Sequence, residues 1–319
     1  MNTLAIRVPT LTIALSVAAF SLAIAEGQPH SMAERVEEEL VRVQSYTGER
    51  VDRLLALGPD AVPELCERLE SYDFPAEIIS VISERQDSRA TASLTNYVRN
   101  AEALRAAEKQ TAGDNEETQA QRELNETEVI KALREIGDPR AEDLLVSIAT
   151  ATETSISVRF EANAALARLG SPEVKARASE EIMQMYRTGK GLANEAWPNP
   201  DVILYDDFYL GLCEVQTEEA EGILAGFIRS RREGYAKQPL IRMLGRRGET
   251  LGREKIIEAL LHVAEHEQED IYRDDAQSTR FAALVSLWLL KANVPLEKLQ
   301  KVAQDLAEDD TFLKSDEPY

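Results

Sequence analysis

The chain has 319 residues, of which 44% are hydrophobic, so it can bury the core of one or two domains and is not disordered throughout. Its 57 acidic residues outnumber its 36 Lys and Arg, and the net charge of −21 argues against the basic surface that nucleic-acid binding requires. Two cysteines and three histidines are too few for a disulfide framework or a cysteine-rich zinc module, and we expect no cofactor.

The N-terminus has the features of a secretory signal peptide. Arg7 is the only charged side chain before Glu26, and residues 8–25 are mostly apolar. The Ala-Ile-Ala sequence at 23–25 matches the small-x-small site of a signal peptidase, so we expect cleavage after residue 25 and a periplasmic or secreted location. An uncleaved anchor is the alternative, because residues 8–25 reach the lower length limit of a bilayer-spanning helix. After cleavage we expect no contact with a membrane.

A turn motif recurs along the rest of the chain, between segments whose apolar residues follow helical spacing. An apolar helix end is followed by Gly or a polar substitute, and then by Asp, Pro or Ser. The clearest copies are Leu-Gly-Pro-Asp at 57–60, Ile-Gly-Asp-Pro at 136–139 and Leu-Gly-Ser-Pro at 169–172. The expected turn positions are 58, 86, 137, 170, 216, 252 and 293, about 39 residues apart on average, which is typical of two-helix repeats.

The chemistry of this turn predicts how each unit folds. Glycine closes a helix by taking a left-handed conformation, and Asp, Ser or Thr after it caps the next helix. One helix pair cannot bury its apolar face alone, so neighbouring pairs must stack. We therefore expect an all-α fold, an α-solenoid of about seven two-helix repeats over residues 48–309. Residues 26–47 would form an N-terminal helical cap, and residues 310–319 a tail.

The stretch from Val129 to Val174 resembles the HEAT-repeat family, and most closely the short bacterial repeats of the phycobilisome-lyase type. The resemblance rests on Ile-Gly-Asp-Pro-Arg-Ala at 136–141 and Ala-Leu-Ala-Arg-Leu-Gly at 165–170. It implies a curved, right-handed helical stack that binds other macromolecules, and it brings no catalytic residue. In this family an Asp after the turn and an Arg of a following helix often form a ladder, and Asp138 and Arg159 occupy such places.

Three stretches are longer than a tight connector: residues 109–125, 188–200 and 267–276. Each would join the second helix of one repeat to the first helix of the next, so all three are expected at one edge of the solenoid. The second insertion leads into a cluster of aromatic residues, a type favoured in protein interfaces. These aromatic residues are the candidate binding residues: Trp197, Tyr205, Phe208 and Tyr209. Packing of Trp197 back onto the solenoid is the alternative.

Residues 262–266 match the His-x-x-Glu-His pattern of inverted zinc peptidases. On a helix, His262 and His266 lie one turn apart and would share a zinc ion, with Glu265 as the general base. Two exposed histidines near a helix end are the alternative, because the chain shows no clear third ligand downstream.

These features predict an exported, noncatalytic scaffold for protein–protein interaction. The partner would be another protein, and the acidity of the chain favours a basic one. Two enzymes are alternatives: a bilin lyase, implied by the resemblance to phycobilisome lyases, and a zinc-dependent hydrolase that uses the 262–266 motif. A structural subunit of an envelope complex is a further alternative.

Overall fold

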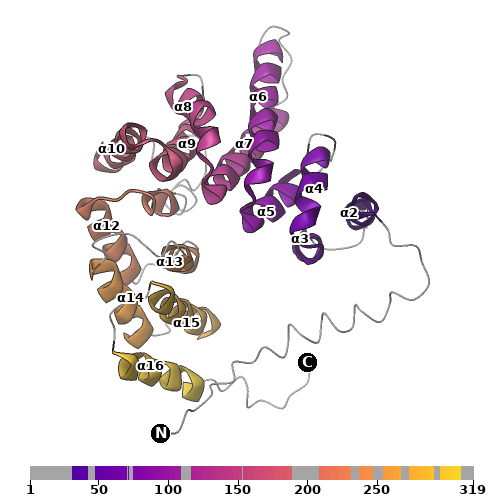
Figure 1. The fold of residues 1–319 in the computed structure, drawn as a ribbon. Helices are drawn as coiled ribbons and strands as arrows, with labels where there is room; N and C mark the ends of the chain where they lie inside the picture. Colours follow the sequence, from indigo (N-terminus) through magenta and orange to yellow (C-terminus); the bar gives the residue numbers. More distant parts are fainter. Residues whose placement is uncertain are drawn as a thin grey trace, which may run out of the picture.

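The helices form two layers that follow one curved path, an inner layer on the concave side and an outer layer on the convex side (Figure 1). The computed structural model describes residues 31–41, 47–69, 71, 75–108, 116–152, 154–188, 208–230, 237–246, 254–266, 273–290 and 295–309. Every regular element in these ranges is a helix. The predicted all-α solenoid is therefore confirmed.

Each repeat contributes one helix to each layer. The inner layer contains α3 (Thr47–Ala56), α5 (Pro75–Arg85), α7 (Glu116–Ile136), α9 (Ile156–Leu169), a helical segment at 208–212, α13 (Lys237–Arg246) and α15 (Arg273–Leu289). The outer layer contains α4 (Val62–Arg68), α6 (Thr91–Glu108), α8 (Glu142–Thr150), α10 (Pro172–Thr188), α12 (Glu218–Arg229), α14 (Glu254–His266) and α16 (Leu296–Asp309). An additional helix, α2 (Met32–Val41), packs against α3 and α4. Each expected turn position lies between the two helices of one pair, so the predicted HEAT-like repeat is also confirmed.

Three of the turns close with a left-handed residue, as the sequence predicts. Gly58 has a φ of 88° and Gly137 a φ of 70°, and Gln86 takes the same conformation with a φ of 50°. Each of these turns continues into a short 3-10 helix that leads into the outer helix: η1 (Pro59–Ala61), η2 (Ser88–Ala90) and η3 (Pro139–Ala141).

Gly170 does not follow this rule, and the prediction of a left-handed conformation is wrong there. Its φ is −62°, a value that any residue can adopt. Lack of space for a side chain explains why this residue is glycine. A Cβ at this position would lie 2.7 Å from the carbonyl oxygen of Leu166 and 2.9 Å from Cγ1 of Val174. The turn between α9 and α10 thus requires glycine because the two helices meet closely.

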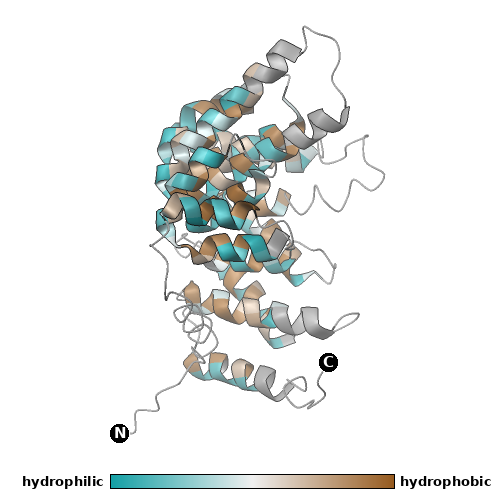
Figure 2. Cartoon of the chain, turned by 90° about the vertical axis from the view of Figure 1, so that its right-hand side faces the viewer, coloured by the Kyte–Doolittle hydropathy of each residue, from teal (hydrophilic) through white to brown (hydrophobic). Residues whose placement is uncertain are grey.

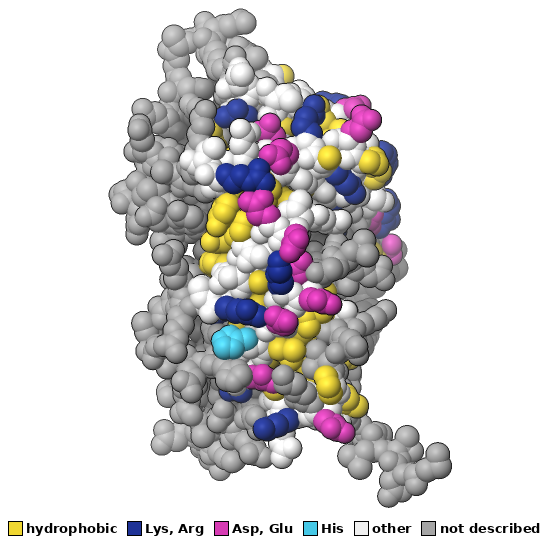
Figure 3. Space-filling view, turned by 90° about the vertical axis from the view of Figure 1, so that its left-hand side faces the viewer, with side chains coloured by type: hydrophobic (Ala, Val, Ile, Leu, Met, Phe, Trp, Pro, Cys, Tyr) yellow, Lys and Arg dark blue, Asp and Glu magenta, His cyan; other side chains and the backbone are white. Residues whose placement is uncertain are grey.

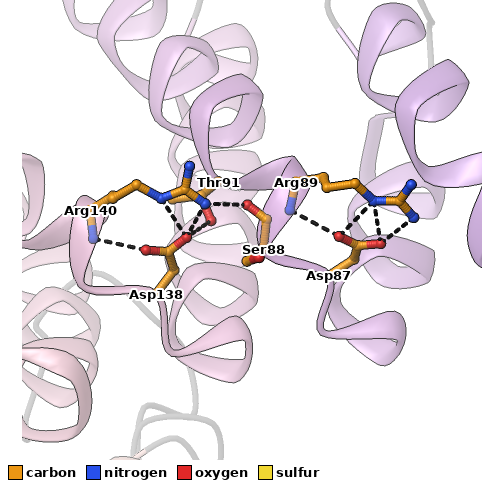
Figure 4. A network of polar contacts seen from close by, with 6 residues as sticks. All are labelled: Asp87, Ser88, Arg89, Thr91, Asp138 and Arg140. Atoms are coloured by element: carbon orange, nitrogen blue, oxygen red, sulfur yellow. Dashed lines mark hydrogen bonds and ion pairs between the residues drawn. The ribbon is translucent and has the colours of Figure 1, made fainter.

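Polar side chains join the turn of one repeat to the turn of the next (Figure 4). Asp138 accepts a hydrogen bond from the backbone N–H of Arg140 at 3.0 Å and another from the hydroxyl of Thr91 at 3.0 Å. The guanidinium of Arg140 binds the Asp138 carboxylate and also donates to the carbonyl oxygen of Ser88 at 2.7 Å. The expected ladder is present in this form, but the partner of Asp138 is Arg140, two residues away, and not Arg159.

The same arrangement occurs one repeat earlier. Asp87 accepts from the backbone N–H of Arg89 at 2.9 Å, and the guanidinium of Arg89 binds the same carboxylate. Arg89 then donates to the carbonyl oxygen of Pro59, in the preceding turn, at 2.8 Å. Each Asp-x-Arg turn therefore caps its own 3-10 helix and reaches back to the repeat before it.

The buried apolar residues of both layers form one continuous core. Figure 2 shows hydrophobic and hydrophilic residues on different sides of many of the helices. Helix α9 is the most enclosed element, with ten of its 14 residues buried. Among the described residues, no helix combines the length and the apolar character needed to cross a bilayer.

The insertions are shorter than the sequence suggests. Residues 116–125 of the first insertion belong to α7, residue 188 of the second ends α10, and residues 273–276 of the third belong to α15. Helical propensity explains the first correction, because Glu, Gln and Arg predominate in residues 116–125 and are good helix formers. The remaining parts of the insertions lie outside the described residues, and so does the expectation that they share one edge.

Candidate protein-binding surface

The inner face of α5 is open to solvent. This helix packs between α3 and α7, and residues such as Ile78 and Ile82 face the core. Ala76, Ser80 and Glu84 are exposed, and their four-residue spacing places them in one row along the helix. Because neighbouring helices occupy the sides of α5, this row belongs to the concave surface of the solenoid.

Every charged side chain at a described exposed position of the first three inner helices is a carboxylate. Among the described exposed positions, the charged residues are Glu49 and Asp52 of α3 and Glu84 of α5, and the others are uncharged; Glu128 of α7 is half-buried. The cations of these helices are more buried and are paired. Arg53 binds Glu39 of α2 at 2.7 Å, and Lys131 binds Glu128 at 3.3 Å. This part of the concave surface is therefore acidic, in keeping with the net charge of the chain.

The structure places Phe208 in the core. Its side chain is 1% exposed and stacks on Phe160 of α9 at 5.5 Å and on Tyr186 of α10 at 5.7 Å, measured between ring centroids. Tyr209 is half-buried and stacks on Phe227 of α12 at 3.8 Å. These rings hold the 208–212 segment between the repeats on either side, so Phe208 packs the solenoid and offers no surface to a partner. The other two candidates lie outside the described residues: Trp197 and Tyr205.

Buried ion pairs connect consecutive inner helices. Arg50 of α3 binds both carboxylate oxygens of Glu77 of α5, at 2.6 and 2.8 Å. Arg134 of α7 binds Glu161 of α9 at 2.8 Å, and its Nε lies 3.8 Å from Glu214. Burial alone would lower the pKa of Arg134, but the carboxylates around it raise this pKa. Arg134 therefore stays charged and ties three inner elements together.

An open hollow of about 370 Å³ lies on the outer face, where α10 meets α12, with Met183 and Glu214 among its lining residues. At its rim, Arg187 binds Glu219 at 2.5 Å and Glu180 at 2.9 Å, and the hydrogen bond from Arg187 lowers the pKa of Glu219. Figure 3 shows Lys and Arg side chains interspersed with Asp and Glu along this face. The outer face thus has mixed charges that are paired across repeats.

The zinc motif lies on α14. His262 is exposed and lines an open hollow of about 430 Å³ with Arg229, Glu258, Leu261 and Glu265. His266 is the last residue of the helix, and its side chain lies outside the described residues. Within the described part of the chain, no group of three His, Cys, Asp or Glu side chains is placed to hold a metal ion. The described geometry therefore adds no third ligand to this pair.

Sequence reasoning missed a row of exposed apolar residues on α15. Phe281 and Trp288 are 61% and 72% exposed, although the helix also has a fully buried side. The sequence contained a signal for this row. Residues 281–290 place apolar side chains on every side of the helix, whereas a half-buried helix needs them on one side only.

No family model and no curated protein matches the chain, so the resemblance to the phycobilisome-lyase type gains no support. Human deoxyhypusine hydroxylase, solved in complex with glycerol, is a similar solved structure, with 16% identity and a TM-score of 0.33. The alignment covers 87% of this chain and 96% of that one.

This comparison corrects one expectation. The neighbour is an enzyme, so we no longer conclude that the chain is noncatalytic. A TM-score of 0.33 at 16% identity does not transfer an activity to this chain either.

Proposed function

We propose that the chain is an exported HEAT-like repeat scaffold that binds another protein along its concave surface. The observation that carries the proposal is the acidic inner surface, where Asp52 of α3 and Glu84 of α5 are exposed on neighbouring helices. Solenoids of this kind use an extended concave face for binding, because each repeat contributes a strip of surface at a constant spacing.

A basic partner suits this surface. Exposed carboxylates on successive repeats attract cationic side chains and speed the encounter, and this attraction weakens as salt is added. The rigid apolar core and the buried Arg50–Glu77 and Arg134–Glu161 pairs keep the spacing of the inner helices constant. A partner with regularly spaced Lys or Arg would therefore match several repeats at once.

The test uses a partner captured from envelope extract by the purified chain, whose affinity is then measured by calorimetry. We expect the charge reversal Asp52→Lys with Glu84→Lys to weaken binding by about tenfold or more, and added salt to weaken the wild-type complex. Glu173→Lys, on the exposed outer face of α10, is the matched control and should bind as the wild type does. Equal loss in the control, or no loss in the double variant, contradicts the proposal.

Trp197 and Tyr205 are proposed as additional contact residues at the edge of the same surface. The double variant Trp197→Ala with Tyr205→Ala should reduce affinity for the captured partner while the helical circular dichroism signal stays unchanged. An unaltered affinity would remove these two residues from the binding surface and leave the acidic inner surface as the proposed site.

Export is the second part of the proposal. It rests on the apolar segment 8–25 and the Ala-Ile-Ala sequence at 23–25. Intact-mass analysis of the protein from the envelope fraction should give a chain that begins at Glu26. Ala25→Arg should block processing and leave the longer chain, whereas an unprocessed wild type would argue for a retained segment.

A further inference from the structure

Four exposed apolar residues form one stripe along α15. Phe281, Val285, Trp288 and Leu289 are 61%, 36%, 72% and 38% exposed. Their spacing of four, seven and eight residues from Phe281 places all four on the same face of the helix. We call this set the α15 stripe.

The helix that carries the stripe is firmly docked on its other side. Ala282, Ala283, Ser286 and Leu287 are buried, and α15 packs against α13, α14 and α16. The hydroxyl of Ser286 donates to the carbonyl oxygen of Ile241 in α13 at 2.8 Å. The α15 stripe is therefore a second apolar face, additional to the one that joins the helix to the core.

The position of α15 in the stack explains why this face is open. The inner helices pack in series, α3 on α5, α5 on α7, α7 on α9 and α13 on α15. Among the described residues, no further inner helix packs against the far side of α15, and this side is apolar and exposed. The terminal repeats of solenoids usually have a polar outer face, which keeps the protein soluble.

We propose that the α15 stripe binds the same stripe of a second copy of this chain, so that two solenoids meet end to end about a two-fold axis. A two-fold contact brings identical patches together, and the uncharged stripe is complementary to itself. A basic partner, by contrast, would find no carboxylate within the stripe. The remaining acidic surface of each elongated copy stays away from the contact, which limits repulsion between two chains of charge −21.

The exposed area is sufficient for a weak dimer. An aromatic side chain buries roughly 150–250 Å², so Phe281 and Trp288 at their exposed fractions contribute on the order of 200–300 Å² per copy. With Val285 and Leu289 added, two copies bury roughly 600–800 Å² in total, which is the size of a weak, transient contact. We expect dissociation in the micromolar range, and tighter association at high salt because screening reduces the repulsion.

Sedimentation equilibrium of the purified chain tests the proposal. The wild type should reach twice the mass of the monomer at micromolar concentration, and Phe281→Glu with Trp288→Glu should remain monomeric. Val41→Glu is the matched control, since Val41 is an apolar residue of α2 that is 60% exposed at the other end of the stack, and it should still dimerise. Circular dichroism checks folding, and Trp288→Ser serves as a milder variant if the double variant unfolds.

Tryptophan fluorescence distinguishes a second copy bound to the α15 stripe from a segment of the same chain that covers it. In a Trp197→Phe background Trp288 is the sole tryptophan, because the chain has two. Its emission should shift to the blue as concentration rises through the dimerisation range. Water-exposed emission with a monomeric mass at every concentration overturns the proposal. Blue-shifted emission that does not depend on concentration also overturns the proposal, because it would mean that a segment of the same chain covers the stripe. A dimer that persists in the Phe281→Glu, Trp288→Glu variant overturns it as well.

Discussion

The carboxylate of Asp138 accepts a hydrogen bond from the hydroxyl of Thr91 at 3.0 Å, although the two residues are 47 positions apart in the chain. The contact joins the turn of one repeat to the first residue of the outer helix in the repeat before it. Because Arg140 reaches the same preceding repeat through the carbonyl oxygen of Ser88, this turn both caps its own helix and fixes the distance to its neighbour.

Replacement of Asp138 by Ala should destabilise the solenoid by about 1–3 kcal/mol, because it removes the cap of η3 and leaves the Thr91 hydroxyl without this partner. Urea denaturation followed by circular dichroism measures the change. Asp143→Ala, at an exposed position of α8, is the control and should stay within about 0.5 kcal/mol of the wild type. A similar loss in both variants would show that the turn contact has no special role.

Acid should weaken this contact. The hydrogen bond from the Arg140 side chain, helped by the Arg140 backbone and Thr91, lowers the pKa of Asp138 to about 2 in the folded protein, from an ordinary value of 3.8. The stabilisation is thus fully present above about pH 4 and is lost as the pH falls towards 2. Between these values the urea midpoint of the wild type should fall more steeply than that of Asp138→Asn, and parallel curves would contradict the assignment.

Loss of Arg134 should be more severe. Arg134→Met leaves the buried carboxylates of Glu161 and Glu214 uncompensated, and such a change costs about 3–5 kcal/mol. Adding Glu161→Gln and Glu214→Gln to the same chain should recover part of the loss in urea denaturation. Arg177→Met, at an exposed site of α10, is the control and should have little effect. If the triple variant is no more stable than Arg134→Met, the buried charges are not the cause.

Two glycines should respond to alanine with opposite signs. A Cβ on Gly245 of α13 would lie 2.5 Å from Oγ and 2.7 Å from Cα of Ser286, so Gly245→Ala must push α13 and α15 apart, at a cost of about 1–3 kcal/mol. Gly226 of α12 has open space around its Cβ position, and Gly226→Ala should stabilise by about 0.5–1 kcal/mol. Thermal denaturation measures both, and a stabilised Gly245→Ala would refute the close approach.

Substitution of Phe208 tests whether this residue packs the core or belongs to the binding surface. Phe208→Ala removes the ring that stacks on Phe160 and Tyr186 and should destabilise the chain by about 3–5 kcal/mol. Phe208→Leu, which keeps most of the volume, should lose less. If Phe208→Ala instead kept its stability and lost only affinity for a partner, the residue would belong to the binding surface after all.

Turns were the most predictable part of this protein. The left-handed conformation at Gly58 and Gly137, and the caps formed by Asp87 and Asp138, depend on residues only two or three positions apart. The backbone conformation of Gly170 was predicted wrongly. Glycine is required there because a Cβ would clash with Val174, and not because the backbone is left-handed.

The candidate site was less predictable. Phe208 lies in an aromatic run that is typical of a contact surface, yet Phe160, 48 residues earlier, and Tyr186 enclose it. The α15 stripe is the opposite case, in which apolar residues of a core-like sequence are exposed. Nothing in the composition distinguishes Trp288, which is exposed, from Leu287, which is buried.

Helical period and turn chemistry alone determined that this chain is a stack of helix pairs and where each pair bends, since both are set by neighbours along the backbone. Only the tertiary structure decided which aromatic ring is enclosed, which groups of the preceding repeat Asp138 and Arg140 reach, and which side of α15 remains open. Those outcomes depend on residues about 20 to 50 positions apart, whose distances are established only when the repeats pack against each other.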